Sequence, residues 1–182
     1  MVKSFIGMGS NLGDGNTTLA DAWAALGGID GITLLAISSP YKTAPVDMDS
    51  QHWFTNAVGC LKVSLSPLEL LQALLGVENA FGRTRNIKKF GYQDRSLDLD
   101  LLYYGDLKMD DPELILPHPR ITEGLFVLVP FSELDPDYID IVSGETISAL
   151  EQQLRDRIGN KNRKDQEIIR DKWDDTESFL VS

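Results

Sequence analysis

Cysteine and histidine are scarce in this 182-residue chain. A single cysteine, Cys60, excludes a disulfide within the chain and favours a reducing compartment. The two histidines, His52 and His118, leave little room for a histidine-based zinc site. The sequence also has no apolar run long enough for a membrane span and no segment typical of a signal peptide. We therefore expect a cytoplasmic enzyme or binding module.

The common glycine-rich nucleotide loops are also missing. The chain has no Walker A loop and no kinase glycine loop, and "GMGSNLGDG" lacks the spacing of a dinucleotide fingerprint. Any phosphate chemistry must therefore depend on a different arrangement of residues.

Basic residues are few and unevenly placed. Seven basic and seven acidic residues lie from Arg155 onward, so the first 154 residues carry the whole net charge of −11. Such an acidic body argues against binding to duplex nucleic acid. Five basic residues nevertheless fall within thirteen positions: Arg83, Arg85, Lys88, Lys89 and Arg95. This basic loop is either a solvated charged segment or a site for a small anion.

The order of expected elements points to one fold class. Strand patterns cover 3–9, 32–41, 54–65 and 95–105, and helical patterns cover 17–26 and 66–81. The order β-α-β-β-α-β is that of a ferredoxin-like α+β core, a mostly antiparallel sheet with packed helices. Further helices are expected near Phe126 and over 147–158, as a C-terminal helical extension. We expect one domain over 1–158 and a charged appendage over 159–182.

The second helix carries the clearest local signal. Ser66 is an N-cap residue, Pro67 suits the first helical position, and Glu69 completes a capping box. Leu71, Leu74 and Leu75 form its apolar stripe, and Glu78 continues that stripe. Spacing alone favours a Glu78 side chain that reaches water at the edge of the stripe, over one that points into a site.

The stretch "RSLDLDLLYYG" carries the main chemical signal. Side chains alternate along a strand, so Leu97, Leu99 and Leu101 share one face and Asp98 and Asp100 share the other. Two neighbouring carboxylates repel each other unless a cation lies between them. Magnesium binds a few carboxylate oxygens together with substrate phosphates, and arginine matches phosphate oxygens. The sequence therefore predicts a metal–polyphosphate site here.

Six segments in order resemble one family. "GMGSNLGD", "YKTAPV", "FTNAV", "ENAFGRTR", "RSLDLDLLYYG" and "LPHPR…FVLVPFSEL" are together similar to the 6-hydroxymethyl-7,8-dihydropterin pyrophosphokinases of folate biosynthesis. The resemblance covers roughly 2–154. It implies transfer of pyrophosphate from ATP to the pterin hydroxymethyl group with release of AMP, on a ferredoxin-like fold with two Mg²⁺ ions.

The resemblance also implies roles for individual residues. Asp98 and Asp100 match the metal ligands, and Asp98 also approaches the pterin hydroxyl. The other residues matched to catalysis or to ATP are Arg83, Arg95, Arg85, Leu71, Leu75, Glu78, Leu101 and His118. Those matched to the pterin pocket are Thr43, Ala44, Val46, Phe54, Asn56 and Phe126.

Two departures from the family pattern affect the site. The segment "FGYQDR" is two residues longer than its family counterpart, so either Phe90 or Tyr92 is expected to stack on the pterin. Gly124 stands where the family often has an arginine, which removes one phosphate contact.

Three functions remain as hypotheses at this stage. The leading one is the pterin pyrophosphokinase, acting as a monomer or weak dimer on ATP and the pterin, without nucleic acid or membrane partners. The second is a related phosphoryl transferase with a different acceptor. The third is a non-catalytic nucleotide- or RNA-binding module, which would need a basic sheet face with exposed aromatic residues.

Overall fold

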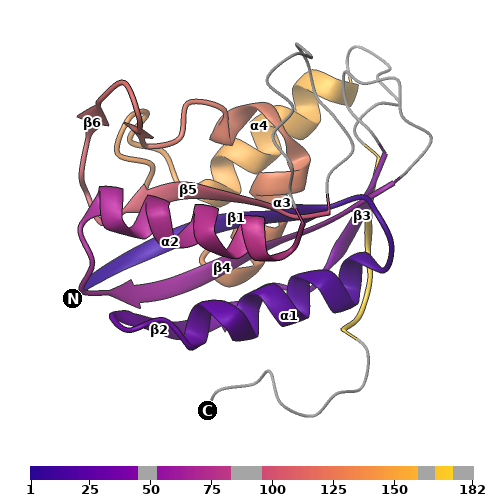
Figure 1. Ribbon diagram of the computed structural model, residues 1–182. Coiled ribbons are helices and arrows are strands. Elements are labelled where there is room, and N and C mark those ends of the chain that lie inside the picture. The colour runs from indigo at the N-terminus through magenta and orange to yellow at the C-terminus, as the bar shows by residue number, and fades with distance from the viewer. Residues whose placement is uncertain (45–52, 83–95, 160–166, 174–182) are drawn as a thin grey trace.

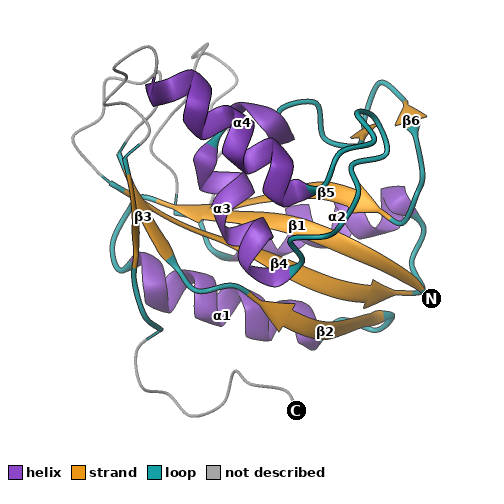
Figure 2. Ribbon diagram, turned by 180° about the vertical axis from the view of Figure 1, so that it is seen from behind, coloured by secondary structure: helices purple, strands orange, loops and turns teal. Residues whose placement is uncertain are grey.

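The computed structural model describes residues 1–44, 53–82, 96–159 and 167–173. These form three layers, with a mostly antiparallel sheet in the middle (Figure 1). Helices α1 (Gly15–Gly27) and α2 (Pro67–Ala80) cover one face, and α3 (Leu125–Leu134) and α4 (Ile147–Gly159) cover the other (Figure 2). None of the described helices is long and apolar enough to cross a membrane.

The sheet has the strand order β5-β1-β4-β3-β8, and β2 pairs with β4 beside β3. Its strands are β1 (Val2–Ser10), β2 (Ile32–Ile37), β3 (Tyr41–Thr43), β4 (Phe54–Val63), β5 (Asp98–Tyr104) and β8 (Ile168–Arg170). A hairpin of β6 (Met109–Asp110) and β7 (Ile115–Leu116) and the short helix η1 (Ile121–Glu123) lie outside it. Since β4 lies between β1 and β2, and β1 between β4 and β5, the chain forms two split βαβ units. The expected ferredoxin-like fold is confirmed.

Helix α2 begins where the sequence predicts, whereas α1 begins at Gly15, two residues before the expected Thr17. The Asp14 side chain accepts hydrogen bonds from the backbone amides of Asn16 and Thr17 at the start of α1. At α2, Ser66 and Glu69 form the full capping box, and Pro67 occupies the first turn. These local bonds satisfy amides that have no partner inside the helix. The capping box explains why sequence alone locates the start of α2.

The single strand expected over 32–41 is two strands in the structure. The expected run over 32–41 ends at Ile37, and a separate strand, β3, takes in Tyr41–Thr43. Pro40 lies between them and lacks an amide hydrogen, and Ser38 donates its amide to Val58 of β4 before the break. The chain therefore bends between β2 and β3 while both keep β4 as their partner.

Two apolar cores lie on opposite faces of the sheet. One joins β1, β4 and β5 to α1 and α2, and there the Trp23 ring lies directly on Gly59, where a Cβ would come within 2.4 Å of a ring carbon. The other joins the sheet to α3 and α4 around an aromatic cluster of Phe5, Tyr103, Phe131 and Tyr138. This double burial explains why the sheet is apolar on both faces over most of its length.

A β-bulge in β5 divides the strand into a segment with strict alternation and a segment where two successive residues face the same core. Ile6 pairs with Leu101 and Phe5 pairs with Tyr103, which leaves Leu102 as an extra residue in β5. Leu101 therefore belongs to the core under α1 and α2, whereas Leu102 and Tyr103 both belong to the opposite core. Beyond the bulge, toward Asp98, the strict alternation predicted from sequence holds.

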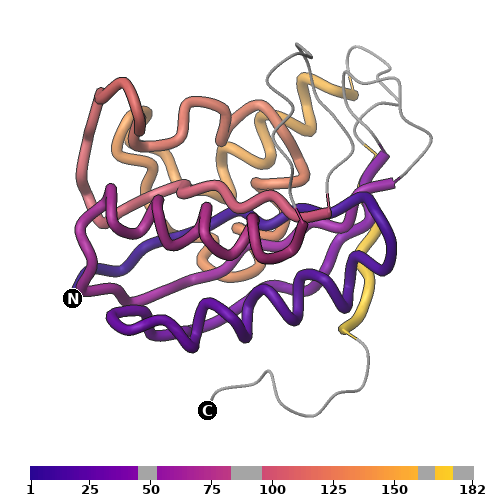
Figure 3. Tube along the Cα trace, viewed as in Figure 1, coloured from indigo at the N-terminus to yellow at the C-terminus, as the bar shows by residue number. Residues whose placement is uncertain are grey.

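The strand β8 comes from the segment that the sequence analysis treats as a charged appendage. It pairs antiparallel with β3, so Tyr41 lies opposite Arg170 and Thr43 opposite Ile168. In Figure 3 this yellow C-terminal segment runs along the β3 end of the sheet. The residues around Ile168 alone carry no strand pattern long enough to predict this pairing.

Candidate active site

The two aspartates of β5 lie on one face of the sheet, and the leucines between them lie on the other. Leu97, Leu99 and Leu101 are buried in the core under α1 and α2. Asp98 is half-buried and Asp100 is exposed. The alternation predicted from sequence is confirmed, and the carboxylates lie on the face that also carries α3 and α4.

Two glycines of β1 flatten the sheet beside these carboxylates. Gly9 pairs with Asp98 on one side and with Asn56 on the other, and Gly7 pairs with Asp100. A Cβ at Gly9 would lie 3.1 Å from Asn56 Oδ1 and 4.0 Å from Asp98 Cβ. The strand between Asn56 and Asp98 therefore carries no side chain on this face, which leaves room for a flat ligand between them.

Glu78 supports the strand between the two aspartates. Its side chain is only 1% exposed, and its Oε1 accepts a hydrogen bond of 2.7 Å from the Leu99 amide. The expectation that Glu78 reaches water is therefore wrong. Because β5 is an edge strand, its outward amides have no partner strand, and the Glu78 carboxylate satisfies the one that lies between Asp98 and Asp100.

His118 is held against the same strand by its backbone. Its amide donates to the Leu102 carbonyl at 2.9 Å, and its Nδ1 accepts from the Arg120 amide at 3.3 Å. A neutral imidazole with Nδ1 as acceptor carries its proton on Nε2, so Nε2–H is available as a donor. Partial burial lowers the pKa of His118, although the negative charges of Asp98 and Glu123 act to raise it.

The residues matched to the pterin pocket at the other side of Gly9 form a small polar cluster. Asn56 Nδ2 donates to Thr43 Oγ1 at 2.8 Å, and both side chains are buried. This bond fixes the Asn56 amide, so its Oδ1 lies toward Gly9. Ala44 follows directly and Phe54 lies opposite Thr43 in the β3–β4 ladder. Thr43, Ala44, Phe54 and Asn56 thus lie together at the end of two paired strands.

Phe126 lies in the first turn of α3 and covers Gly124. A Cβ at Gly124 would come within 2.2 Å of the Phe126 ring, although the backbone at Gly124 has an ordinary extended conformation. The glycine is therefore required by the position of this ring and not by its own φ. A larger residue at position 124 would move Phe126 away from its present place.

The leucines matched to ATP lie on the face of the sheet that α1 and α2 cover. Leu101 is buried in the core under α2, Leu71 packs against that core, and Leu75 is half-buried on α2. They form the packed wall behind the edge of β5. Six further residues of the sequence-based site lie outside the described residues: Val46, Arg83, Arg85, Phe90, Tyr92 and Arg95.

The chemistry of the two carboxylates fits a divalent cation that is shared with phosphates. Within the described residues, no group of three or more histidine, cysteine, aspartate or glutamate side chains is placed to hold a metal. A pair of carboxylates supplies part of the shell that Mg²⁺ takes, and substrate phosphates and water complete such shells. The described donors therefore fit an ion bound with its substrate better than a permanent all-protein site.

Sequence analysis missed two features that tertiary pairing creates. The first is the open position at Gly9, and the spacing of Gly7 and Gly9 on a strand was the available signal. The second is the contact of β8 with β3, beside Thr43. Only the glycine spacing was open to prediction.

A family model matches residues 5–136, and its description is 7,8-dihydro-6-hydroxymethylpterin-pyrophosphokinase (HPPK). A 2-amino-4-hydroxy-6-hydroxymethyldihydropteridine pyrophosphokinase of Methylorubrum extorquens is 38% identical over 147 residues, 81% of this chain and 90% of that protein. The protein of the same name from Synechocystis is 41% identical over 149 residues, 82% of this chain and 74% of that one.

Solved structures share the fold. A crystal structure of an HPPK-DHPS in complex with substrates matches with a TM-score of 0.74 and 11% identity, over 93% of this chain and 46% of that one. The Plasmodium falciparum HPPK-DHPS matches with a TM-score of 0.72 and 13% identity, over 93% and 44%. This chain therefore spans about half the length of the solved proteins that it matches, and the match shows the architecture alone.

Proposed function

Because the chain belongs to the 7,8-dihydro-6-hydroxymethylpterin-pyrophosphokinase family, we propose that it is the 2-amino-4-hydroxy-6-hydroxymethyldihydropteridine diphosphokinase of folate biosynthesis. It transfers the β,γ-pyrophosphoryl group of ATP to the hydroxymethyl oxygen of 6-hydroxymethyl-7,8-dihydropterin. The new bond joins that oxygen to the β-phosphorus. The bond from the β-phosphorus to the α,β-bridging oxygen breaks, AMP leaves, and the hydroxyl proton is released.

One observation carries this proposal beyond family membership. Asn56 and Asp98 lie on the two sides of Gly9, on one face of the sheet, with no side chain between them. A pterin is flat and has hydrogen-bonding groups along its edge. An amide such as Asn56 pairs with that edge, and the position of Gly9, which carries no side chain, admits the ring toward Asp98.

The chain's part in the reaction is positioning and charge balance. Phosphoryl transfer depends chiefly on an in-line arrangement of nucleophile and phosphorus and on neutralising the phosphate oxygens. Asp98, closer to Asn56 than Asp100 in the pairing of strands, lies nearer to the acceptor hydroxyl. The Nε2–H of His118 is the group that would donate to a phosphate oxygen.

Two Mg²⁺ ions are part of the proposal. When bound, Mg²⁺ neutralises phosphate charge and polarises the phosphorus under attack. Asp98 and Asp100 would hold the ions, and Glu78 would keep the strand between them fixed through the Leu99 amide. Arg83, Arg85 and Arg95 are proposed to engage the triphosphate, and Phe90 or Tyr92 to stack on the pterin.

A coupled AMP-release assay with purified protein, ATP, magnesium chloride and the hydroxymethylpterin tests the function. We expect AMP and pterin diphosphate in equal amounts, no turnover with excess EDTA, and recovery when magnesium is restored. ATP consumption only with a different acceptor would establish the related phosphoryl transferase instead. The names of the relatives do not favour that alternative.

The assembly and compartment are part of the same proposal. We propose a monomer or weak dimer that acts in the cytoplasm. Light scattering during size exclusion, at several protein concentrations, measures the assembly.

A further inference from the structure

Residues 167–173, called the C-terminal strap below, run along the whole length of β3. The Glu167 carbonyl accepts from the Ala44 amide at 3.2 Å, and the Asp171 amide donates to the Pro40 carbonyl at 2.8 Å. Between these two bonds, β8 pairs with all three residues of β3. The strap thus follows β3 from the bend before it to the first residue after it.

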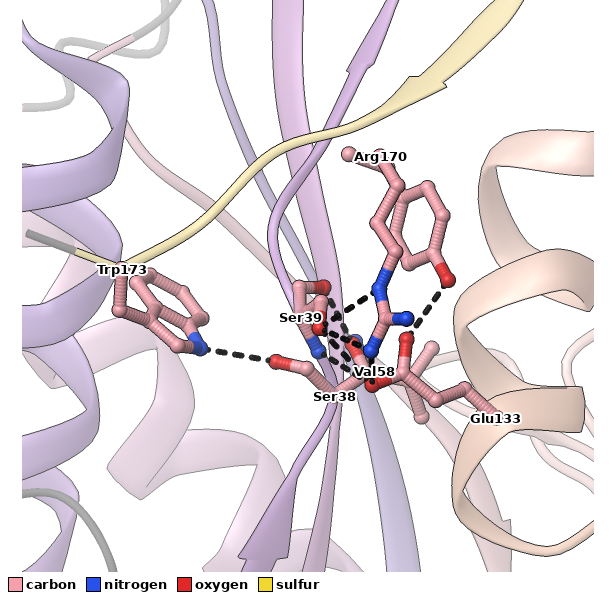
Figure 4. Close-up of polar contacts among 7 residues, drawn as sticks. Ser38, Ser39, Val58, Glu133, Arg170 and Trp173 are labelled. Atoms are coloured by element: carbon pink, nitrogen blue, oxygen red, sulfur yellow. Dashed lines mark hydrogen bonds and ion pairs between the residues drawn. The ribbon is translucent and has the colours of Figure 1, made fainter.

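Hydrogen bonds to Ser38 and to Asn16 hold the C-terminal end of the strap. The Trp173 Nε1–H donates to the Ser38 carbonyl at 3.0 Å, and the Trp173 ring packs against the core under α1 (Figure 4). Asn16 of α1 donates its Nδ2–H to the Lys172 carbonyl at 3.1 Å and to Asp171 Oδ2 at 3.3 Å. These contacts tie the strap to the first turn of α1 and to the chain segment before β3.

A second fastening joins the strap to α3. The Arg170 guanidinium donates to Ser39 Oγ at 2.9 Å and to Glu133 Oε1 at 3.1 Å (Figure 4). Glu133 also accepts from the Tyr41 hydroxyl at 2.6 Å and from the Ser39 amide at 3.0 Å. A single carboxylate of α3 therefore holds both β3 and β8.

The strap contacts the proposed pterin pocket through β3. Thr43 lies opposite Ile168 of the strap in one ladder and opposite Phe54 of β4 in the other. The Thr43 hydroxyl in turn accepts from Asn56. β3 has only three residues, and it lies between β4 on one side and the strap on the other. Any shift of β3 away from β4 would release the Asn56 amide from its fixed orientation.

We propose that the C-terminal strap belongs to the substrate-binding apparatus: it positions Thr43, and through it Asn56, for the pterin. This inference rests on the proposed function. Glu167, Ile168, Ile169 and Arg170 are positioning residues in this scheme, because none of them touches the substrate. The family model ends at residue 136, before the strap begins, so that match assigns the strap no role.

The sharpest variant is Ile169→Pro, with Ile169→Val as its matched control. Hydrogen-bonded pairs alternate along an antiparallel ladder, so the bonds at Ala44–Glu167 and Pro40–Asp171 make Lys42–Ile169 the bonded pair between them. Proline at 169 removes the amide hydrogen of that pair, whereas valine keeps it. The Ile169 side chain is half exposed, so neither change opens a core cavity.

We expect Ile169→Pro to raise KM for the pterin roughly five- to tenfold, the effect of losing one well-placed hydrogen bond. KM for ATP should stay as in the Ile169→Val enzyme, because β1 and β4 lie between β3 and the strand that carries the aspartates. Equal pterin KM in the two variants, at a temperature well below both melting points, would overturn the proposal. The strap would then stabilise the fold without positioning the substrate.

A milder variant decides the matter if Ile169→Pro does not fold. Trp173→Phe keeps an aromatic ring and loses only the bond to the Ser38 carbonyl. A rise in pterin KM without a change in ATP KM supports the proposal, and no rise overturns it. Calorimetric titration with the pterin and a non-hydrolysable ATP analogue gives the same comparison without turnover.

If the wild type binds the pterin but releases no AMP, the proposed function fails while the strap is still tested. If it does not bind the pterin, both fail.

Discussion

The outward-facing backbone groups of β5 and of β3 find their hydrogen-bond partners in different ways. At the β5 edge, a buried side chain, Glu78, accepts from a strand amide, and the neighbouring Asp98 and Asp100 stay accessible. At the β3 edge, a whole backbone segment, β8, pairs with the strand and covers it. A single side chain leaves the carboxylates of β5 accessible, whereas a paired strand fixes the backbone of β3, which carries Thr43.

The largest effect is expected at the β5 edge. Asp98→Ala and Asp100→Ala should each lower AMP formation by a factor on the order of 100 to 1,000, because each removes a charge that positions the reacting groups. The circular dichroism spectrum and melting temperature should remain those of the wild type, since neither carboxylate lies in a core. Asp110→Ala, an exposed acid on the hairpin, is the matched control. Normal turnover in either site variant would rule out the metal-ligand assignment.

Variants of Glu78 test the stability of the β5 edge separately from its proposed metal binding. Glu78→Leu leaves the Leu99 amide buried without its acceptor, so the free energy of unfolding should fall by about 1–3 kcal/mol. Glu78→Gln keeps an acceptor oxygen and should recover most of that stability. Urea unfolding of both variants measures the difference. If the two are equally unstable, the negative charge of Glu78 matters and the hydrogen bond to Leu99 does not.

Gly9 lies between the two edges and links them. In Gly9→Ala the new methyl group lies 3.1 Å from Asn56 Oδ1 and closes the strip that the pterin would occupy. KM for the pterin should rise roughly five- to tenfold, again the scale of one displaced hydrogen bond. Gly76→Ala is the control, because a Cβ there meets no atom within 4 Å and alanine favours the helix. An unchanged pterin KM in Gly9→Ala would place the substrate elsewhere.

The smallest expected effect is the response of the β3 edge to acid. Burial opposes ionisation of Glu133, but hydrogen bonds from Tyr41 and Ser39, together with the Arg170 charge, lower its pKa below the ordinary 4.5. A depressed pKa stabilises the fold at pH values above 4.5, and that stabilisation disappears as the pH falls through the folded-state pKa.

Glu133→Gln removes this dependence. The variant should lose roughly 1–2 kcal/mol of unfolding free energy at pH 7, and less at lower pH, because the wild type also loses its charged contacts there. Thermal melts from pH 7 to pH 3 compare the two proteins. A constant difference between them over that range would show that the Glu133 charge has no part in holding the strap.

The sequence determined the main helices and strands of the core and the face on which Asp98 and Asp100 lie. The capping box at Ser66 and the alternation around Asp98 both depend on residues within a few positions of each other, so local rules predict them. The four-strand, two-helix order then leaves few ways to bury both sheet faces, and the ferredoxin-like fold follows.

Only the tertiary structure decided which distant groups meet. Glu78 and Leu99 are 21 positions apart, and Arg170 and Ser39 are 131 apart. No periodicity records such pairs, because their contact depends on how the sheet edges are closed and not on local conformation. The side chain that supports the aspartates and the strap beside Thr43 therefore became visible only once the chain was folded.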